Sequence, residues 1–356
     1  RPDRAYRAQT EGYDRYVARA WPPAVSYLSK PYGAEPAALS ARIADIQTLD
    51  GAVRVSQSDL EKFCSCNASW FLSRALGVEP MTRDAELPNE RNLGLLYHAV
   101  LRDLYARVRD EDGVFSSKRL ADYAEWAASF ARKATSDHAE FRGPLAAPLI
   151  ETLARRVTDG IAGILELDAK HLDGYVPAYL EHDLSFSEDG VRYYGKVDRI
   201  SVNPADGTAV IIDYKSGKAR GPSAYAVEEV EEEGDEDSAV LGDYQIPMYV
   251  RLAEQSPQSP CRGKRVGEAW FASIKERKFK PVVSDGEPFA SMRKKTFVTR
   301  EAFADAMRVF DSGVKSFADA VAGNDWTRPK GLDRSVCAGC DFRAVCRYLY
   351  SVGGRS

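Results

Sequence analysis

Alternating apolar and polar residues predict two neighbouring strands near the middle of the chain, at about 195–200 and 210–215. Residues 203–207 between them combine Asn, Pro, Asp and Gly, which is the composition of a hairpin turn. The same alternation predicts further strands at about 178–186 and 266–274. The middle of the chain is therefore expected to contribute a sheet.

Apolar residues at helical spacing predict helices before, between and after these strands. They span about 58–76, 89–109, 118–137, 147–172, 243–252 and 299–322. The first has Ser58 and Glu61 at the spacing of a capping box, and Gly77 is expected to end it. We interpret 110–175, which holds two of these helices, as a helical insert that covers the core.

The domain organisation follows from where this patterning begins. Residues 1–55 lack clear periodicity and contain Pro breaks, so we interpret them as a connector from a preceding region. We interpret 56–356 as one domain, because the predicted elements fill it. The chain opens on Arg1, which favours excision from a longer polypeptide over an intact start.

Composition fits a folded domain with an unusual charge distribution. The 356 residues are 44% hydrophobic, enough for a sizeable core. No apolar run reaches the roughly 18 residues of a membrane span, so no membrane association is expected. The net charge is −4, but 228–237 alone holds eight acidic residues, and the rest of the chain carries +4. We interpret 228–237 as a mobile acidic loop.

The paired central strands carry the candidate chemistry. Side chains two apart on a strand share a face, so Asp213 and Lys215 point the same way and Tyr214 the other. With Asp198 on the partner strand, two carboxylates and an ammonium converge, a set that suits Mg²⁺ and phosphodiester chemistry. An isolated Asp-x-Lys is more often a strand-end ion pair. The second Asp and the apolar strand leading into Asp213 favour the metal site.

Four ordered motifs carry a resemblance to a known family. They are Gly-x-x-x-His at 94–98, Gly-Lys-Val-Asp-Arg at 195–199, Asp-Tyr-Lys-Ser-Gly at 213–217 and Tyr-Gln-Ile-Pro-Met-Tyr at 244–249. With these motifs, about 56–350 resembles the RecB-type branch of the PD-(D/E)XK nucleases. The resemblance implies an α/β fold of the restriction-endonuclease type, in which helices flank a central mixed sheet.

The resemblance also implies a metal site. His98, Asp198 and Asp213 would bind Mg²⁺ or Mn²⁺, with the backbone carbonyl of Tyr214 as a further ligand. Lys215 would support the water that attacks the phosphodiester. A lone helical histidine is more often a surface or core residue, and it is the match to Gly-x-x-x-His that favours His98 as a ligand.

Three further residues are candidates for the same site. Gln245 can hydrogen-bond the lysine or a phosphate oxygen through its amide, and we prefer it to Tyr249, which lies one helical turn later. Glu181 is a candidate third carboxylate, because relatives often place an acidic residue on the first core strand. A solvent-facing strand residue is an equally good interpretation of Glu181.

The cysteines predict a second metal centre. The three within 337–346 are separated by two and five residues, which does not suggest disulfides in a chain expected in the cytoplasm. A fourth thiolate would come from Cys64, Cys66 or Cys261, and four thiolates hold either zinc or a [4Fe–4S] cluster. The resembled iron–sulfur nucleases imply a structural [4Fe–4S] staple, although Asn67 replaces their usual proline. The implied ligands are Cys66, Cys337, Cys340 and Cys346.

The implied function is a metal-dependent DNA exonuclease that acts on ends or single strands. The closest resemblance is to the C-terminal nuclease domain of AddB-type helicase–nuclease subunits, which implies double-strand-break repair with an AddA-like partner. One alternative is a CRISPR adaptation nuclease with the same cysteine layout. Another is a DNA-binding scaffold without catalysis, and a third is an electron-transfer protein.

A basic stretch suggests where DNA binds. Between residues 262 and 295 the chain has ten Lys or Arg against four acidic residues. Aromatic residues interleave with them, namely Trp270, Phe271, Phe279 and Phe289. Such a pattern can track phosphates and stack bases of a single strand. The alternative is an ordinary charged hairpin, and we favour DNA contact only because the phosphodiester site is argued independently.

Overall fold

A computed structural model describes most of the chain. The described residues are 43, 47–79, 90–137, 146–217, 219–225, 239–286, 298–326 and 334–346. The acidic run 228–237 lies outside them, as do Phe289 and the basic residues 293–295.

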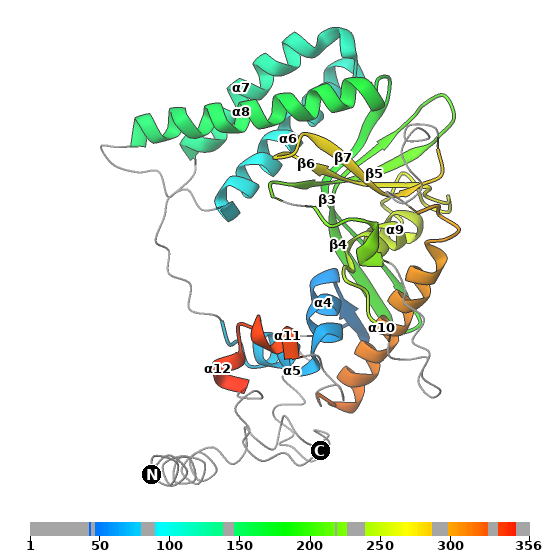
Figure 1. The fold of residues 1–356 in the computed structure, drawn as a ribbon. Helices are drawn as coiled ribbons and strands as arrows, with labels where there is room; N and C mark the ends of the chain where they lie inside the picture. The colour runs from blue at the N-terminus through cyan, green and yellow to red at the C-terminus, as the bar shows by residue number, and fades with distance from the viewer. Residues whose placement is uncertain are drawn as a thin grey trace. The chain divides into compact units, whose positions relative to one another are not determined.

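The described strands form one mixed sheet of seven strands in the order β1-β2-β4-β5-β6-β7, with β3 also paired to β4 (Figure 1). Their bounds are Thr48–Leu49 (β1), Ala52–Val55 (β2), Val176–Glu188 (β3), Val191–Val202 (β4), Ala209–Lys215 (β5), Glu268–Ser273 (β6) and Lys278–Ser284 (β7). β5 runs antiparallel to β4 and parallel to β6, and β7 returns antiparallel to β6. The predicted mixed sheet is confirmed.

The predicted hairpin between β4 and β5 is present, and its turn residues explain it. The side chain of Asn203 accepts a hydrogen bond from the backbone N–H of Ala205, and Asp206 accepts one from Thr208. Gly207 has a φ of +77°, which favours glycine. This short turn fixes the register in which Arg199 pairs with Ile212. Asp198 directly precedes Arg199 and Asp213 directly follows Ile212, so the two aspartates lie next to this pair.

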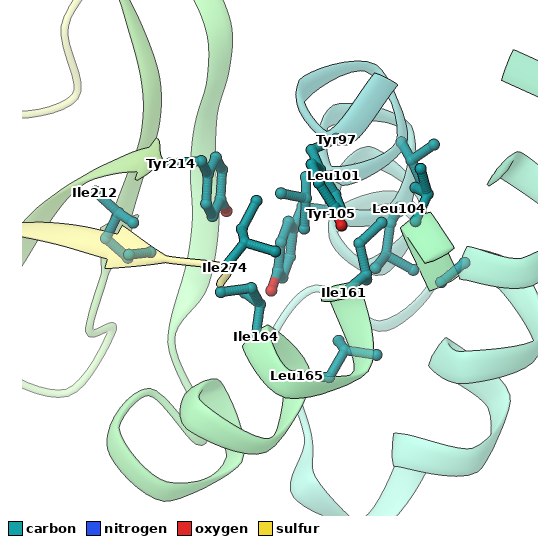
Figure 2. Close-up of a cluster of buried hydrophobic side chains, with 14 of the residues drawn as sticks. Tyr97, Leu101, Leu104, Tyr105, Ile161, Ile164, Leu165, Ile212, Tyr214 and Ile274 are labelled. Atoms are coloured by element: carbon teal, nitrogen blue, oxygen red, sulfur yellow. The ribbon is translucent and has the colours of Figure 1, made fainter. Parts of the chain in front are cut away.

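Three long helices pack on one face of the sheet. They are α6 (Glu90–Asp112), α7 (Leu120–Asp137) and α8 (Ala146–His171), and they form a helical layer (Figure 1). Their apolar stripes meet the sheet in one buried cluster, which includes Leu101, Leu104, Ile161, Ile164, Ile212 and Ile274 (Figure 2). Burying each such side chain contributes about 1.5–3 kcal/mol. The predicted helical insert is thus a packed layer of the core.

The chain folds as two compact units, and the sheet residues that carry the candidate chemistry belong to one of them. That unit comprises 83–188 and 192–311, and the other comprises 1–82, 189–191 and 312–356. The smaller unit includes β1 and β2, and its Val53 N–H donates to the carbonyl of Gly190. Sheet structure therefore begins within the segment that we expected to be a connector.

The helix predicted at about 58–76 differs in the structure. It is α4 (Gln57–Ser65), and its capping box is formed by Ser56 and Asp59 rather than by Ser58 and Glu61. The helix breaks at Cys66, whose extended backbone precedes α5 (Asn67–Trp70) and a π-helical turn, Phe71–Ala75. Trp70 and Trp326 stack with ring centroids 4.4 Å apart, which places a buried aromatic core beneath this break.

The remaining described elements complete the fold. They are the 3₁₀ turns Ser117–Arg119 (η2) and Pro222–Tyr225 (η3), and the helices Gln245–Gln255 (α9), Ala304–Gly323 (α10), Arg334–Ala338 (α11) and Arg343–Cys346 (α12). Helix α9 lies close to β4 because Gly195 has no side chain: a Cβ there would come within 2.9 Å of Leu252 Cδ1. None of the described helices is both long and apolar enough to cross a lipid bilayer.

Candidate active site

The ends of β4 and β5 bring the two central aspartates together. Asp198 Oδ2 accepts a hydrogen bond of 2.8 Å from the backbone N–H of Tyr214. On β5, Lys215 Nζ lies 2.8 Å from Asp213 Oδ2, while the ring of Tyr214 is buried in the core cluster on the other face. The alternation predicted for 213–215 is therefore present.

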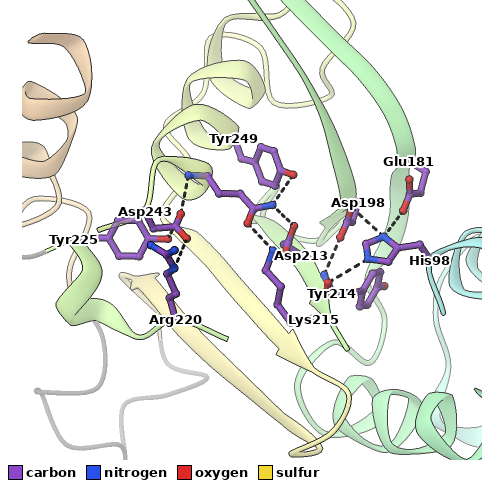
Figure 3. Close-up of polar contacts among 11 residues, drawn as sticks. His98, Glu181, Asp198, Asp213, Tyr214, Lys215, Arg220, Tyr225, Asp243 and Tyr249 are labelled. Carbon is purple, nitrogen blue, oxygen red and sulfur yellow. Dashed lines mark hydrogen bonds and ion pairs between the residues drawn. The ribbon is translucent and has the colours of Figure 1, made fainter. Parts of the chain in front are cut away.

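Helix α6 and strand β3 add two more side chains to this end of the sheet (Figure 3). His98 Nδ1 lies 2.7 Å from Glu181 Oε1 and 3.4 Å from Asp198 Oδ1. His98 Nε2 lies 3.2 Å from the carbonyl oxygen of Tyr214. Within the described part of the chain, His98, Glu181 and Asp198 form the one group of three metal-ligating side chains whose ligand atoms lie within 4.8 Å of one another.

Glu181 reaches this group through an unusual backbone conformation. Its φ is +49°, a left-handed conformation that costs a residue with a side chain roughly 1–2 kcal/mol. The side chain is only 8% exposed, which excludes the interpretation of a solvent-facing strand residue. Its carboxylate instead contacts His98 and, at 2.5 Å, Lys196 Nζ. The contacts with His98 and Lys196 offset the strain of the left-handed backbone at Glu181.

The close acidic groups alter proton affinities across the site. Burial opposes protonation of His98, but hydrogen bonds and charge from Asp198 and Glu181 outweigh it and raise its pKa to about 10. Burial and the negative charge of Asp198 raise the pKa of Asp213 to about 7, although Lys215 opposes the rise. The site therefore holds more negative charge than its nearby cations neutralise.

Helix α9 contributes an amide that joins the lysine to the aspartate. Lys215 Nζ donates to Gln245 Oε1 at 2.6 Å, and Gln245 Nε2 donates to Asp213 Oδ1 at 2.6 Å. The same Nε2 lies 2.9 Å from the hydroxyl of Tyr249, one helical turn away. At the start of α9, the Gln245 backbone N–H donates to Asp243 Oδ1. The position of Gln245 is therefore fixed at both ends.

These residues fit a divalent metal ion. Their donors are an imidazole and carboxylates, the ligands that Mg²⁺ and Mn²⁺ accept. Asp213 is buried, and its Oδ2 faces the ammonium of Lys215 at 2.8 Å. The like charges of Asp198 and Asp213 also raise the free energy of the metal-free site, and a cation would relieve this repulsion.

Comparison with known families agrees with this geometry. The model of the PD-(D/E)XK nuclease superfamily matches residues 54–347, which is most of the chain. The chain belongs to the PD-(D/E)XK nuclease superfamily. Membership in this superfamily implies metal-dependent nuclease activity, and the described sheet with its flanking helices is consistent with the superfamily fold.

One relative of the chain is an uncharacterized protein of Treponema pallidum (strain Nichols). It is 33% identical over 144 residues, which are 40% of this chain and 18% of the relative. The match therefore spans much less than two thirds of that protein.

Three residues around the PD-(D/E)XK site were not anticipated from the sequence. Lys196 contacts Glu181, Asp243 holds the start of α9, and Arg220 Nε lies 3.6 Å from Asp243 Oδ2. Lys196 lies two residues before Asp198 on one strand, so the period of two could have revealed that both share a face. Nothing in the local sequence indicates the other two, because their contacts join segments that fold together only in three dimensions.

Three aromatic residues of the basic stretch lie in the described part of the chain, and they are not placed to stack on bases as predicted, while Phe289 lies outside it. Trp270 and Phe271 are fully buried and Phe279 is 5% exposed, so none of them can stack on a base. Trp270 and Phe279 instead pack against each other with ring centroids 5.3 Å apart. The pattern of basic and aromatic residues is that of a hairpin whose aromatic side chains fill the core.

Cys66, Cys337, Cys340 and Cys346 belong to the smaller unit. In the smaller unit, burial raises the pKa of the Cys66 thiol, the N–H groups of Ser69 and Ala68 oppose the rise, and the charges of Cys346 and Cys340 add to it. The Cys340 sulfur also accepts a hydrogen bond of 3.4 Å from the backbone N–H of Phe342. Cys261 is buried in the larger unit.

Proposed function

We propose that this protein is a metal-dependent DNA exonuclease of the RecB type. The observation that carries the proposal is the convergence of His98, Glu181 and Asp198 within 4.8 Å, beside the pair formed by Asp213 and Lys215. The residues come from α6, β3, β4 and β5, so only the folded chain assembles them. An isolated Asp-x-Lys ion pair would not require this assembly.

In the proposed mechanism, His98, Asp198 and Asp213 hold Mg²⁺ or Mn²⁺, with Glu181 and the Tyr214 carbonyl as further ligands. When bound, the metal supplies an activated water and neutralises charge on the phosphate. The ammonium of Lys215 orients the attacking water and stabilises the negative charge that develops on the phosphate oxygens. Gln245 holds that ammonium in place through its hydrogen bond of 2.6 Å.

The proposal extends to a biological setting. The ordered motifs at 94–98, 195–199, 213–217 and 244–249 support an AddB-type nuclease domain that works with an AddA-like helicase–nuclease subunit in double-strand-break repair. In the Treponema relative the matched region is a small part of a longer protein, which accords with a nuclease module joined to other regions.

We also propose a [4Fe–4S] staple on Cys66, Cys337, Cys340 and Cys346. The electrostatic effect of Cys340 and Cys346 on the Cys66 thiol supports it, because these sulfurs lie 274 or more positions away in the sequence. Such a cluster would close a long loop of chain and fits a reducing, cytoplasmic compartment. Iron and zinc analysis of anaerobically purified protein, with its absorbance spectrum, decides between the cluster and zinc.

The nuclease proposal is tested with a linear single-stranded DNA labelled at either end and a circular single strand of the same sequence. Mg²⁺-dependent loss of the linear DNA but not of the circle is expected, and Asp213→Ala should abolish it. Asp183→Ala, exposed on β3, is the matched control and should cleave normally. DNA binding without cleavage by the unmodified chain would favour a non-catalytic scaffold.

A further inference from the structure

The face of the sheet that carries Asp213 and Lys215 continues beyond β5. Lys215 pairs with Ser273 on β6, and Ser273 pairs with Lys278 on β7. Paired residues on neighbouring strands point to the same face of the sheet, and neighbouring strands lie about 4.8 Å apart. Lys278 therefore lies on the same face as Lys215, roughly 10 Å across the sheet.

The packing of neighbouring residues confirms which face this is. Lys215 Nζ lies 5.2 Å from the ring centroid of Phe271, the residue that pairs with Asp213. Phe279, next to Lys278, points the opposite way and packs with Trp270 on the helix-covered face. The alternation along β7 thus leaves Lys278 on the side of the metal site.

Lys278 is an exposed cation that pairs with no carboxylate in the described part of the chain. Its neighbour on the same face, Lys280, is half-buried and lies 2.5 Å from Glu276 Oε2, so its charge is neutralised locally. Arg277 is turned away, and its guanidinium donates to the Asp159 carbonyl on α8. Lys278 is consequently available to a ligand at this end of the strand.

A second cation approaches from the segment that follows β5. Arg220 is exposed, and the carboxylate that it contacts, Asp243, also acts electrostatically on Lys215 (Figure 3). The turn η3, two residues after Arg220, packs against β7. Arg220 thus lies near Lys215, on the segment that continues the chain beyond β5.

We propose that Lys215, Arg220 and Lys278 form a row that binds successive phosphates of one DNA strand, on the β7 side of the bond that is cleaved. The inference rests on the proposed function, since it assumes that DNA is the substrate. A row of fixed cations beside a metal site neutralises backbone charge without reading bases, so it suits a sequence-independent nuclease. The other basic turn, residues 262–265, lies at the opposite end of β6 and takes no part.

The test measures binding of a fluorescein-labelled single-stranded 30-mer by the full chain, in EDTA and across a salt series. Lys278→Gln is expected to weaken binding about two- to fivefold. It should also reduce the magnitude of the slope of log binding constant against log salt concentration by about 0.7. The same variant should raise KM and leave kcat unchanged in Mg²⁺. Lys264→Gln, on the exposed turn near Gly207, is the matched control and should change neither quantity.

The outcomes separate this inference from the nuclease proposal. If the chain cleaves DNA but Lys278→Gln binds and cleaves like the unmodified protein, the row is wrong and the nuclease stands. If cleavage is absent but binding still depends on Lys278 and not on Lys264, the row stands and the hydrolytic proposal fails. Equal weakening by Lys264→Gln would overturn the row, because binding would then follow general surface charge.

Discussion

The carboxylate of Glu181 lies 2.7 Å from Nδ1 of His98, across 83 positions of sequence. Since Nδ1 also faces Asp198 at 3.4 Å, Glu181 either coordinates the metal or orients His98 toward it. In both cases its charge increases the affinity of the site for a cation.

Glu181→Gln should therefore raise the Mg²⁺ concentration needed for half-maximal cleavage by about 10- to 100-fold, because it preserves shape and removes charge. A metal titration of the nuclease rate measures this shift. Asp183→Asn, an exposed residue on the same strand, is the control. An unchanged midpoint for Glu181→Gln would remove this residue from the metal site.

We expect the amide of Gln245, which accepts a hydrogen bond from Lys215, to position this lysine rather than to touch the substrate. Gln245→Ala should lower kcat by about tenfold while Lys215→Ala lowers it by about 10²–10³, since the ammonium is the group that stabilises developing charge. The double variant should be no slower than Lys215→Ala, because the amide acts through the lysine. Gln255→Ala, exposed at the end of the same helix, should retain full activity. Additive losses in the double variant would assign Gln245 an independent role.

The raised pKa of Asp213 makes the metal-free protein sensitive to pH. Asp213 has a pKa of about 7 in the folded chain and about 3.9 when unfolded, so folding favours its protonated form. Its contribution to stability is complete below about pH 4 and is lost as pH rises through about 7. Asp213→Asn, which cannot ionise, should be more stable than the unmodified chain at pH 8 in EDTA, by on the order of 2–4 kcal/mol.

Urea unfolding at pH 5 and pH 8 measures this difference, and the advantage of Asp213→Asn should be smaller at pH 5. Adding Mg²⁺ at pH 8 should stabilise the unmodified chain and not the variant, because metal ligands must be deprotonated. The unmodified chain should also need less Mg²⁺ at pH 8 than at pH 6. An advantage of the variant that is the same at both pH values would contradict the raised pKa.

The sequence predicts those parts of the fold that depend on local periodicity. The β4–β5 hairpin, the long helices and the shared face of Asp213 and Lys215 all follow from periods of 2 and 3.6, and the structure has them. Two turn residues, Asn203 and Asp206, suffice to close the hairpin.

Other features depend on contacts distant in sequence and could not be predicted. The positive φ of Glu181 is maintained by His98 and Lys196, so no local rule indicates it. The helix break at Cys66 lies beside an aromatic core that includes Trp326, 260 positions later. Burial of Phe271 depends on the packing of its strand within the sheet, whereas its sequence neighbours suggest an exposed DNA-binding surface.

A buried ion pair behind the site supplies the last prediction. Arg199 and Asp168 are each 1% exposed and joined by two hydrogen bonds of 2.7 and 2.8 Å, which tie β4 to α8 next to Asp198. The guanidinium also lies 4.2 Å from the ring centroid of Tyr105. Arg199→Met should cost about 3–5 kcal/mol of unfolding free energy, because it leaves a buried carboxylate without its cation. Arg199→Met combined with Asp168→Leu should cost less than the sum of the two single changes.

Urea unfolding of the four proteins in this cycle measures the coupling. The matched control is the exposed pair Arg107 and Glu111 on α6, whose side chains are 40% and 45% exposed and whose loss should cost under about 1 kcal/mol. Because β4 carries Asp198, the single variant Arg199→Met should also weaken Mg²⁺ activation, and the double variant should restore part of it. Strictly additive unfolding free energies would show that Arg199 and Asp168 stabilise the fold independently, and the proposed support of Asp198 through this pair would then be wrong.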